Sequence, residues 1–185
     1  MLVTYRQYSP LDIREGDIIL FRTEFEPFKN PVSLLSAAVR FFTQCKYNHS
    51  AIVTKVNNVL HIVEAKEEGV VSNRLIDVLD RQKDKILILR SQNVPADVSE
   101  RANSLVGLPY DFINLILFQV MYRTPKLLFG KYGPWFGPTG DGADDSLVCS
   151  EVCAYAHHIP EFYKMASSDF IGYPGFCIAF QEPFE

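Results

Sequence analysis

No run of apolar residues in the sequence is long enough to cross a membrane: a spanning helix needs about 18 or more, and the nearest candidate, residues 112–122, is shorter. The N-terminal segment lacks a charged head, an apolar core and a small-residue cleavage site, so it does not predict a secretory leader. There is no long basic run, no repeat and no low-complexity linker, and the formal net charge is −4. We therefore expect no spanning segment and no nucleic-acid partner.

Cysteine is scarce, and its spacing excludes two common roles. The four cysteines form no Cys-x-x-Cys pair that would indicate zinc and no regular disulfide framework; they are Cys45, Cys149, Cys153 and Cys177. His157 and His158 are adjacent and so do not face the same ligand. We expect free thiols, no metal and no cofactor. The compartment stays open between the cytoplasm, an injected protein and a phage particle.

What is present is the composition of a globular protein with a core, at 48% hydrophobic and 13% aromatic residues over 185 positions. The length predicts one domain, residues 1–185. β-branched and apolar runs bounded by turns predict strands within residues 12–22, 49–56, 59–66, 69–75, 85–91 and 171–181. Apolar residues at helical spacing predict helices at 31–43, 75–82, 95–107, 112–122 and from 148 onward.

These elements predict an α+β fold, an antiparallel sheet or small barrel packed against helices. The 112–122 segment is expected to be a buried helix. Residues 123–145 hold five Gly and three Pro and predict a long loop or flap, a feature that is uncommon unless it is functional or disordered. The sequence does not say whether this loop is a lid, nor does it give the oligomeric state.

Cys149 lies where this turn-rich segment becomes a helix, in SLVCSEVCAYAHH. The unpaired N–H groups and dipole of a helix start favour a thiolate, and a nearby histidine would hold it as an ion pair and protonate the leaving group. The simpler interpretation is a small core residue, as most free cysteines are. Cys153, deeper in the helix, fits that interpretation better.

A histidine and a carboxylate are supplied by two predicted strands. If residues 49–56 and 59–66 form a hairpin through Asn57-Asn58, His49 faces Lys66 and Glu64 is its diagonal neighbour on the same face. His61 has the other parity and faces away. Taken singly, a histidine such as His49 is more often structural, and a glutamate such as Glu64 is more often a solvated charge. Their combination with Cys149 and the preceding Gly/Pro-rich loop strengthens the catalytic interpretation, but the residue pattern alone leaves the catalytic and structural interpretations both open.

Five segments strengthen this hypothesis by their order. These segments lie within residues 14–160 and are, in order, GDIILF, TQCKYNHSAIV, VLHIVEA, GLPYDF and LVCSEVCAYA. Together they resemble the circularly permuted branch of the NlpC-like papain-fold hydrolases, and most of all the YiiX/YaeF-like amidases. In ordinary NlpC-type peptidases the cysteine helix comes first. Here the histidine comes first, as in permuted members and lecithin–retinol-acyltransferase-like proteins. The resemblance implies Cys149 as nucleophile, His49 as general base and acid, and Glu64 as the group that orients His49.

The resemblance also implies a substrate or oxyanion role for two further residues. Tyr110 matches the tyrosine of the Gly-x-Pro-Tyr segment that lies beside the cleft, although a core aromatic would look the same. Ser150 follows the cysteine as small residues do in this superfamily. One departure concerns specificity: NlpC peptidases usually have Asp before the cysteine, whereas this chain has Val148, which leaves action on cell-wall peptides open.

The resulting hypothesis is a cysteine peptidase or amidase that acts through an acyl-enzyme on a small peptide, amide or acyl substrate, with cell-wall peptides and lipoyl or other acyl amides as candidates. A second enzyme class is a thioesterase or lipid acyltransferase, because residues 112–136 are apolar and could line an acyl-chain groove. A third possibility is a catalytically silent module that binds a peptide or lipid.

Overall fold

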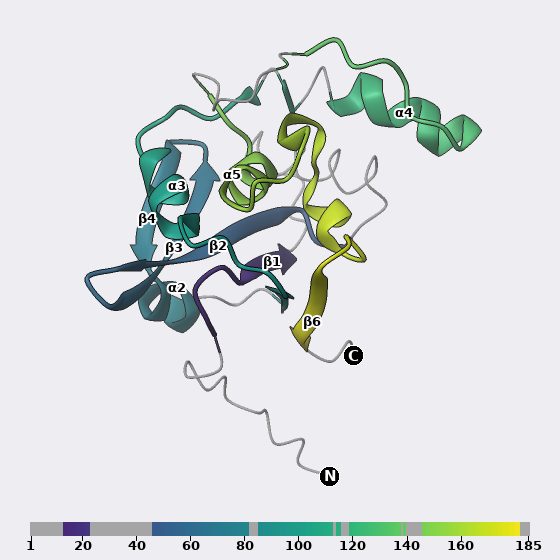
Figure 1. Cartoon of the computed structure of the whole chain (residues 1–185). Coiled ribbons are helices and arrows are strands. Elements are labelled where there is room, and N and C mark those ends of the chain that lie inside the picture. Colours follow the sequence, from purple (N-terminus) through teal and green to yellow (C-terminus); the bar gives the residue numbers. More distant parts are fainter. Residues whose placement is uncertain are drawn as a thin grey trace.

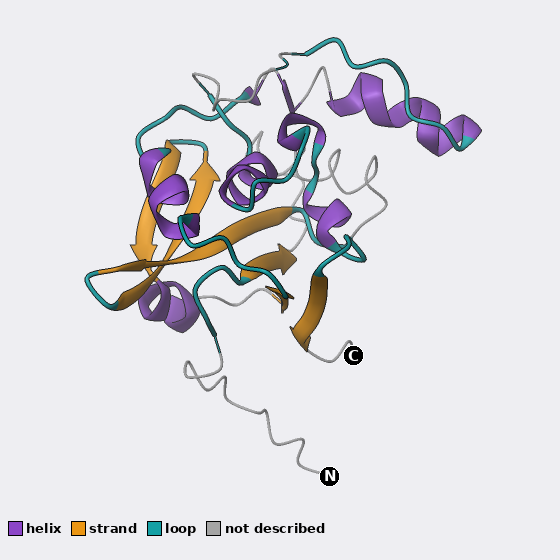
Figure 2. Cartoon of the chain, viewed as in Figure 1, coloured by secondary structure: helices purple, strands orange, loops and turns teal. Residues whose placement is uncertain are grey.

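A six-stranded antiparallel sheet organises the chain, in the strand order β4-β3-β2-β1-β5-β6 (Figures 1 and 2). The computed structural model describes residues 13–22, 46–81, 85–112, 114–115, 119–137, 139 and 146–181. The strands are β1 Ile18–Arg22, β2 His49–Val56, β3 Val59–Lys66, β4 Gly69–Arg74, β5 Lys85–Ser91 and β6 Phe176–Gln181. The described strands form an open sheet, so of the two expected forms of the α+β class the sheet, not the barrel, is observed.

Helices lie on both sides of this sheet, with α3 and α5 on one side and α2 on the other (Figure 1). The α-helices are α2 Leu75–Arg81, α3 Val98–Ser104, α4 Gln119–Phe129 and α5 Cys149–Ala156, and two short 3-10 helices are η3 Phe162–Lys164 and η4 Ser167–Phe170. None of the described helices is both long enough and apolar enough to cross a bilayer.

Alternation along the strands divides the core into two clusters. Ile52 and Val63 face α5 and pack with its Val152, whereas Val53 and Ile62 belong to the cluster on the α2 side. Successive strand residues point to opposite faces, so the continuous apolar runs of β2 and β3 serve both clusters. This burial on two sides makes the central strands a rigid base for the residues at their ends.

The β2–β3 hairpin has the register expected from the sequence. Val56 pairs with Val59 and Ile52 with Val63, and the two turn residues Asn57 and Asn58 have φ of +49° and +63°. Two central residues with positive φ define the type I′ turn, whose twist matches that of the flanking strands and which asparagine tolerates. The predicted register is therefore confirmed.

Of the other predicted elements, those that fall on described residues are confirmed with one exception. The predicted strands correspond to β1–β6, and three predicted helices correspond to α2, α3 and α5. The helix expected at 31–43 lies outside the described residues. In the range 112–122, expected to be a buried helix, residues 112, 114–115 and 119–122 are helical, and 113 and 116–118 lie outside the described residues. The expected change to a loop at 123 was wrong, because α4 runs from Gln119 to Phe129, and Met121 is exposed instead of buried.

Pro125 made that boundary hard to predict, since a proline inside a helix removes one backbone donor and usually ends it. Here the chain returns after α4, and the Gly133 N–H donates to the Tyr122 carbonyl at 2.9 Å. A Cβ on Gly133 would lie 2.9 Å from both the Met121 carbonyl oxygen and Pro125 Cγ. The absence of a side chain on this glycine thus lets the returning chain pack closely against the turn that contains Pro125.

Candidate active site

Cys149 is the first residue of α5, and a buried carboxylate holds this helix start. The preceding Val148 is extended, and its N–H donates to Glu151 Oε2 at 2.8 Å. The other oxygen of Glu151 accepts a hydrogen bond of 2.6 Å from Asn114 Nδ2. Glu151 and Asn114 were missed in the sequence. A glutamate three residues after the residue that caps a helix is half of a capping box, which is the signal that could have found Glu151.

The segment before Cys149 is held against the GLPYDF motif. Leu147 N–H donates to the Pro109 carbonyl at 3.1 Å, and Asp111 N–H donates to the Leu147 carbonyl at 3.2 Å. Tyr110 thereby pairs with Leu147 in a short parallel bridge. Burial, and then the negative charge of Cys149, raise the pKa of Tyr110 well above its usual value. Its phenol therefore stays protonated at neutral pH.

His49 and Glu64 meet across the hairpin as the register requires. His49 Nε2 lies 2.8 Å from Glu64 Oε2, and Lys66 Nζ lies 2.6 Å from Glu64 Oε1. Burial alone would raise the pKa of Glu64, but hydrogen bonds and charge from His49 and then Lys66 outweigh it and lower the pKa. Glu64 is thus an anion that accepts a hydrogen bond from Nε2 of the imidazole. The other ring nitrogen, Nδ1, remains available for a second partner.

That partner is Cys149. Burial opposes charge on both groups, yet the attraction and hydrogen bond between them dominate. Together with Glu64, Cys149 raises the pKa of His49 to about 10, and His49 lowers the pKa of Cys149 to about 7, well below the usual thiol value of about 8.5. The pair therefore favours a thiolate beside an imidazolium at neutral pH. The ring of Phe21, with its centroid 5.6 Å from that of His49, packs against the imidazole.

Two buried serines, also missed in the sequence, complete the surroundings of the thiol. Backbone and side-chain hydrogen bonds from Ser50 help to lower the pKa of Cys149, after the larger effects of burial and His49. Ser167 Oγ lies 3.8 Å from Cys149 Sγ and donates to Ser50 Oγ at 3.1 Å. Ser50 lies two residues before Ile52 in β2, and Ile52 faces α5. Because side chains alternate along a strand, Ser50 points to the same face of the sheet. No sequence pattern indicates Ser167, which comes from η4.

Ser150 and the remaining described cysteines lie in different environments. Ser150 Oγ donates to the Met165 carbonyl at 2.7 Å, so its hydroxyl anchors the segment that follows α5, while its backbone N–H belongs to the first turn of the helix. Cys153 is fully buried, and burial raises the pKa of its thiol. Cys177 is exposed. All three described cysteines are free thiols, and Cys45 lies outside the described residues.

The other histidines lie apart from this arrangement. His157 Nε2 is 2.9 Å from the Gly16 carbonyl oxygen, His158 pairs with Asp97, and His61 Nδ1 is 3.3 Å from Ser72 Oγ. Within the part of the chain that the structure describes, no group of three or more His, Cys, Asp or Glu side chains could hold a metal ion.

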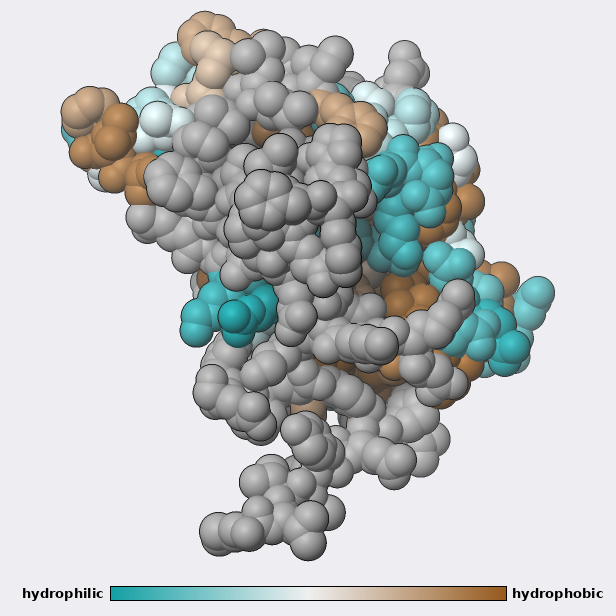
Figure 3. Space-filling view, turned by 180° about the vertical axis from the view of Figure 1, so that it is seen from behind, coloured by the Kyte–Doolittle hydropathy of each residue, from teal (hydrophilic) through white to brown (hydrophobic). Residues whose placement is uncertain are grey.

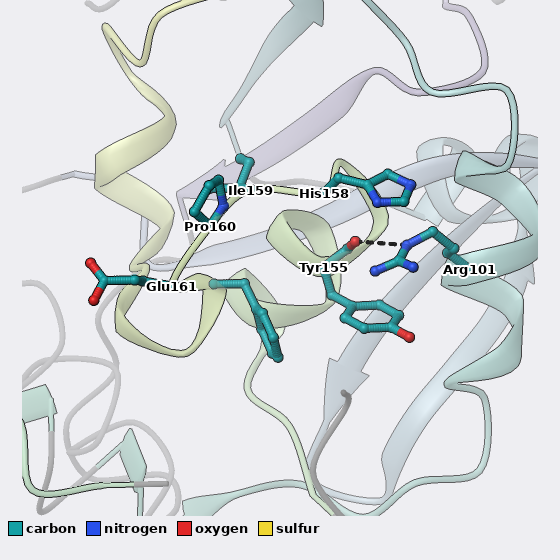
Figure 4. Close-up of a pocket in the computed structure, with 7 residues that line it drawn as sticks. Arg101, Tyr155, His158, Ile159, Pro160 and Glu161 are labelled. Carbon is teal, nitrogen blue, oxygen red and sulfur yellow. Dashed lines mark hydrogen bonds between the residues drawn. The ribbon is translucent and has the colours of Figure 1, made fainter. Parts of the chain in front are cut away.

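A cavity near the C-terminal end of α5 is also separate from the candidate site. Figure 4 shows it beside the hydrogen bond from Arg101 Nε to the Tyr155 carbonyl, which measures 3.1 Å. Its lining residues are Arg101, Tyr155, His158, Ile159, Pro160, Glu161 and Phe162. Cys149, His49 and Glu64 are not among them, so this cavity takes no part in the arrangement around the thiol.

Comparison with known proteins agrees with this fold. Residues 12–123 match the family model described as permuted papain-like amidase enzymes, YaeF/YiiX, C92 family. This range contains His49, Glu64 and Tyr110 but ends before Cys149. No curated protein matches the chain significantly. The resemblance to the permuted amidases is confirmed.

A solved structure supports the same fold over nearly the whole chain. The metalloprotein YiiX of Escherichia coli O157:H7 is similar with a TM-score of 0.58 at 15% sequence identity, covering 91% of this chain and 97% of that one. At this identity the likeness shows the fold alone. The description as a metalloprotein is said of YiiX. The expected fold class, α+β of the permuted papain-like type, is confirmed.

Proposed function

The chain belongs to the family of permuted papain-like amidases that includes YaeF and YiiX, and from this premise we propose that it hydrolyses amide bonds through an acyl-enzyme on Cys149. One observation carries the proposal: a thiol of lowered pKa at a helix start interacts with an imidazole whose Nε2 lies 2.8 Å from a buried carboxylate. This is the nucleophile, base and orienting group of a catalytic triad, with the roles taken by Cys149, His49 and Glu64.

The steps follow from these positions. The Cys149 thiolate attacks the carbonyl carbon, a C–S bond forms, and the oxyanion accepts hydrogen bonds from N–H groups in the first turn of α5. The C–N bond then breaks as the His49 imidazolium gives its proton to the leaving amine. Water attacks the resulting thioester, His49 takes the proton of that water, and the C–S bond breaks to release the acid and restore the thiolate.

Other side chains support these steps. The Glu64 carboxylate keeps the imidazole in place and stabilises its charged form. The Tyr110 phenol, protonated because its pKa is raised, is proposed as a donor to the substrate or oxyanion, with the backbone N–H of Ser150 as a further donor. One domain, residues 1–185, carries the whole reaction on a small peptide or amide substrate, and no cofactor takes part.

A thioesterase or lipid acyltransferase activity at the same Cys149 is the second candidate. It is favoured by the exposed apolar side chains of α4 and the segment after it, among them Leu128, Phe129 and Phe136. The acyl-enzyme is common to both activities, so the two differ only in the leaving group and the acceptor. Comparing amide and thioester substrates that carry the same acyl group distinguishes them.

The test is the rate of alkylation by iodoacetamide against pH, with mass spectrometry to locate the label. We expect Cys149 to react fast with a midpoint near pH 7, because the thiolate is the reactive form and is lost as the pH falls through this value. The exposed Cys177 is the internal reference thiol, and the buried Cys153 is expected to stay unlabelled.

The His49→Ala variant is the control for the ion pair. Without the imidazolium the thiol pKa rises, so the midpoint for Cys149 is expected to move to higher pH. Slow labelling of Cys149 in the unmodified protein, with an ordinary midpoint near 8.5, would contradict the proposal and favour a catalytically silent binding module.

A further inference from the structure

Helix α4 differs from an ordinary surface helix in which side chains it buries. A charged side chain points inward, while large apolar side chains are exposed, and we call this arrangement inverted. Arg123 is 5% exposed; it forms an ion pair with Asp169 of η4 and donates from Nη2 to the Lys164 carbonyl at 2.8 Å. A surface helix of a globular protein normally buries its apolar stripe and exposes its charges. A paired arginine is therefore the most buried of the α4 side chains whose burial the structure describes.

Three large apolar side chains of the same helix are exposed. Leu128 is 65% and Phe129 78% exposed, and Met121 shares their side of the helix. Tyr132 and Phe136, the latter 61% exposed, extend this apolar surface beyond the end of the helix. Figure 1 shows α4 at the periphery, and Figure 3, seen from behind, shows hydrophobic atoms at the corresponding projecting end, at upper left. Large exposed apolar side chains gathered on one projecting segment indicate an interaction site.

The charged side chains within this segment have one sign. Residues 112–139 contain no Asp or Glu, although the chain as a whole has a net charge of −4. Lys126 and Lys131 are exposed next to the apolar side chains. Since Arg123 is already neutralised by Asp169, these two lysines are the cations that face outward from this segment. An occupant of the surface should combine an apolar interior with negative charge at its boundary.

We propose that this α4 surface, formed by Met121, Leu128, Phe129, Tyr132 and Phe136 with Lys126 and Lys131, docks on an anionic lipid bilayer. The apolar side chains enter the boundary between headgroups and acyl chains, as in helices that lie in the membrane plane. The lysines reach lipid phosphates, and the tyrosine and tryptophan of the segment suit the depth of the headgroups. Docking needs no spanning helix.

The ion pair between Arg123 and Asp169 connects this surface to the candidate active site. Asp169 lies in η4, and the same short helix carries Ser167, whose hydroxyl is 3.8 Å from Cys149 Sγ. Docking through α4 therefore holds η4, and with it the thiol, close to the lipid surface. The docking itself does not depend on the chemistry of Cys149 and can be measured without turnover.

The test uses the full chain and its only tryptophan, Trp135, which packs against Tyr122 at the base of the surface. The probe is a vesicle of phosphatidylcholine with about 30% phosphatidylglycerol. We expect the protein to sediment with these vesicles, less so with pure phosphatidylcholine or at high salt. Lipids brominated on the acyl chains are expected to quench Trp135. Failure to sediment with the anionic vesicles, or sedimentation without quenching, would overturn the proposal.

Variants with matched controls identify the surface. Leu128→Ser with Phe129→Ser is expected to weaken vesicle binding by at least about tenfold, whereas Val106→Ser with Ile178→Ser, which alters two exposed apolar residues elsewhere, leaves it unchanged. Lys131→Gln is expected to weaken it about fivefold, unlike Lys55→Gln. Equal effects of test and control variants would contradict the proposal. So would light scattering that shows a dimer dissociated by the Leu128 and Phe129 changes, because the surface would then bind a second copy of the chain.

Discussion

Helices α5 and α4 both come from segments that are rich in apolar residues, yet they relate to the protein in opposite ways. In α5 seven of the eight residues are buried, and its polar side chains Ser150 and Glu151 have partners inside the protein. Among the α4 residues whose burial is described, the buried side chain is Arg123, while Leu128 and Phe129 are exposed. Apolar content predicts that a segment is helical. Which side of the helix is buried depends on the partners that the rest of the chain supplies, here Asp169.

The contrast extends to what each helix needs in order to function. The start of α5 is held from several sides by Glu151, Leu147 and the GLPYDF segment, which keeps the thiol in fixed geometry as a nucleophile requires. On the outer side of α4, by contrast, Leu128 and Phe129 are exposed to water. The candidate active site is thus built from polar groups that have hydrogen-bond partners, whereas the proposed docking surface is built from apolar side chains that are exposed to water.

The largest expected effect separates the two thiols of α5. Cys149→Ala should abolish the burst of acyl-enzyme formation with p-nitrophenyl acetate, a loss of at least about 10³-fold, because the nucleophile is removed. The thermal midpoint should stay nearly unchanged. Cys153→Ala, one turn further along and fully buried, is the control and should keep the burst while lowering the midpoint. A large loss of stability in Cys149→Ala would identify Cys149 as a core residue.

The second effect concerns how α4 is attached. Arg123→Met should lower the free energy of unfolding by about 2 kcal/mol, because it removes one partner of a largely buried ion pair, although partial exposure of Asp169 reduces the effect. Leu128→Ser, at an exposed position of the same helix, should change it by less than about 0.5 kcal/mol. Urea unfolding gives both values. If the leucine change were the more destabilising one, α4 would not be inverted.

The third effect tests the orienting role of Glu64. Glu64→Gln should slow turnover about tenfold or more, because a neutral amide holds the imidazole but no longer stabilises its charge. The pKa of His49 should fall, and the alkylation midpoint of Cys149 should move to higher pH. The exposed Glu68→Gln, in the β3–β4 turn, is the control. An unchanged alkylation profile in Glu64→Gln would show that Glu64 is not the third member of the triad.

The smallest expected effect distinguishes the serines near the thiol. Ser50→Ala removes one hydrogen bond to Cys149, so the thiol pKa should rise by about half a unit, and the alkylation rate at pH 6 should fall about threefold. Ser150→Ala should leave the midpoint where it is, because this hydroxyl donates to the Met165 carbonyl instead. Identical profiles for Ser50→Ala and the unmodified protein would show that the Ser50 hydroxyl does not act on the thiolate.

Local rules were enough to predict a large part of this arrangement. Alternation along two strands, together with an Asn-Asn turn that permits only a tight hairpin, predicted the register that brings His49 and Glu64 together. The start of α5 at Cys149 was also predictable, because a turn-rich segment precedes a helical pattern. Such features depend on residues near one another in the chain and on the fixed periods of strands and helices.

The remaining contacts join residues far apart in the chain, and no local period reports them. Ser167 of η4 lies near Cys149 because folding brings together two residues that are 18 positions apart in the chain. Asn114 and Glu151, which form a hydrogen bond, are 37 positions apart. For the same reason the sequence-based prediction was wrong about where α4 ends and about the burial of Met121. Pro125 indicated an end of the helix, whereas the helix continues to Phe129 and the returning Gly133 packs against it.

By itself, then, the sequence determined the strands, the hairpin register, the helix start at Cys149 and membership of the permuted papain-like amidases, since each depends on short-range order or on the succession of motifs. Tertiary structure alone decided the ionisation of Cys149 and His49, because both pKa values depend on groups that folding brings together. It also decided that Arg123 is buried and Phe129 exposed, because the inward side of a helix is chosen by its partners and not by its composition.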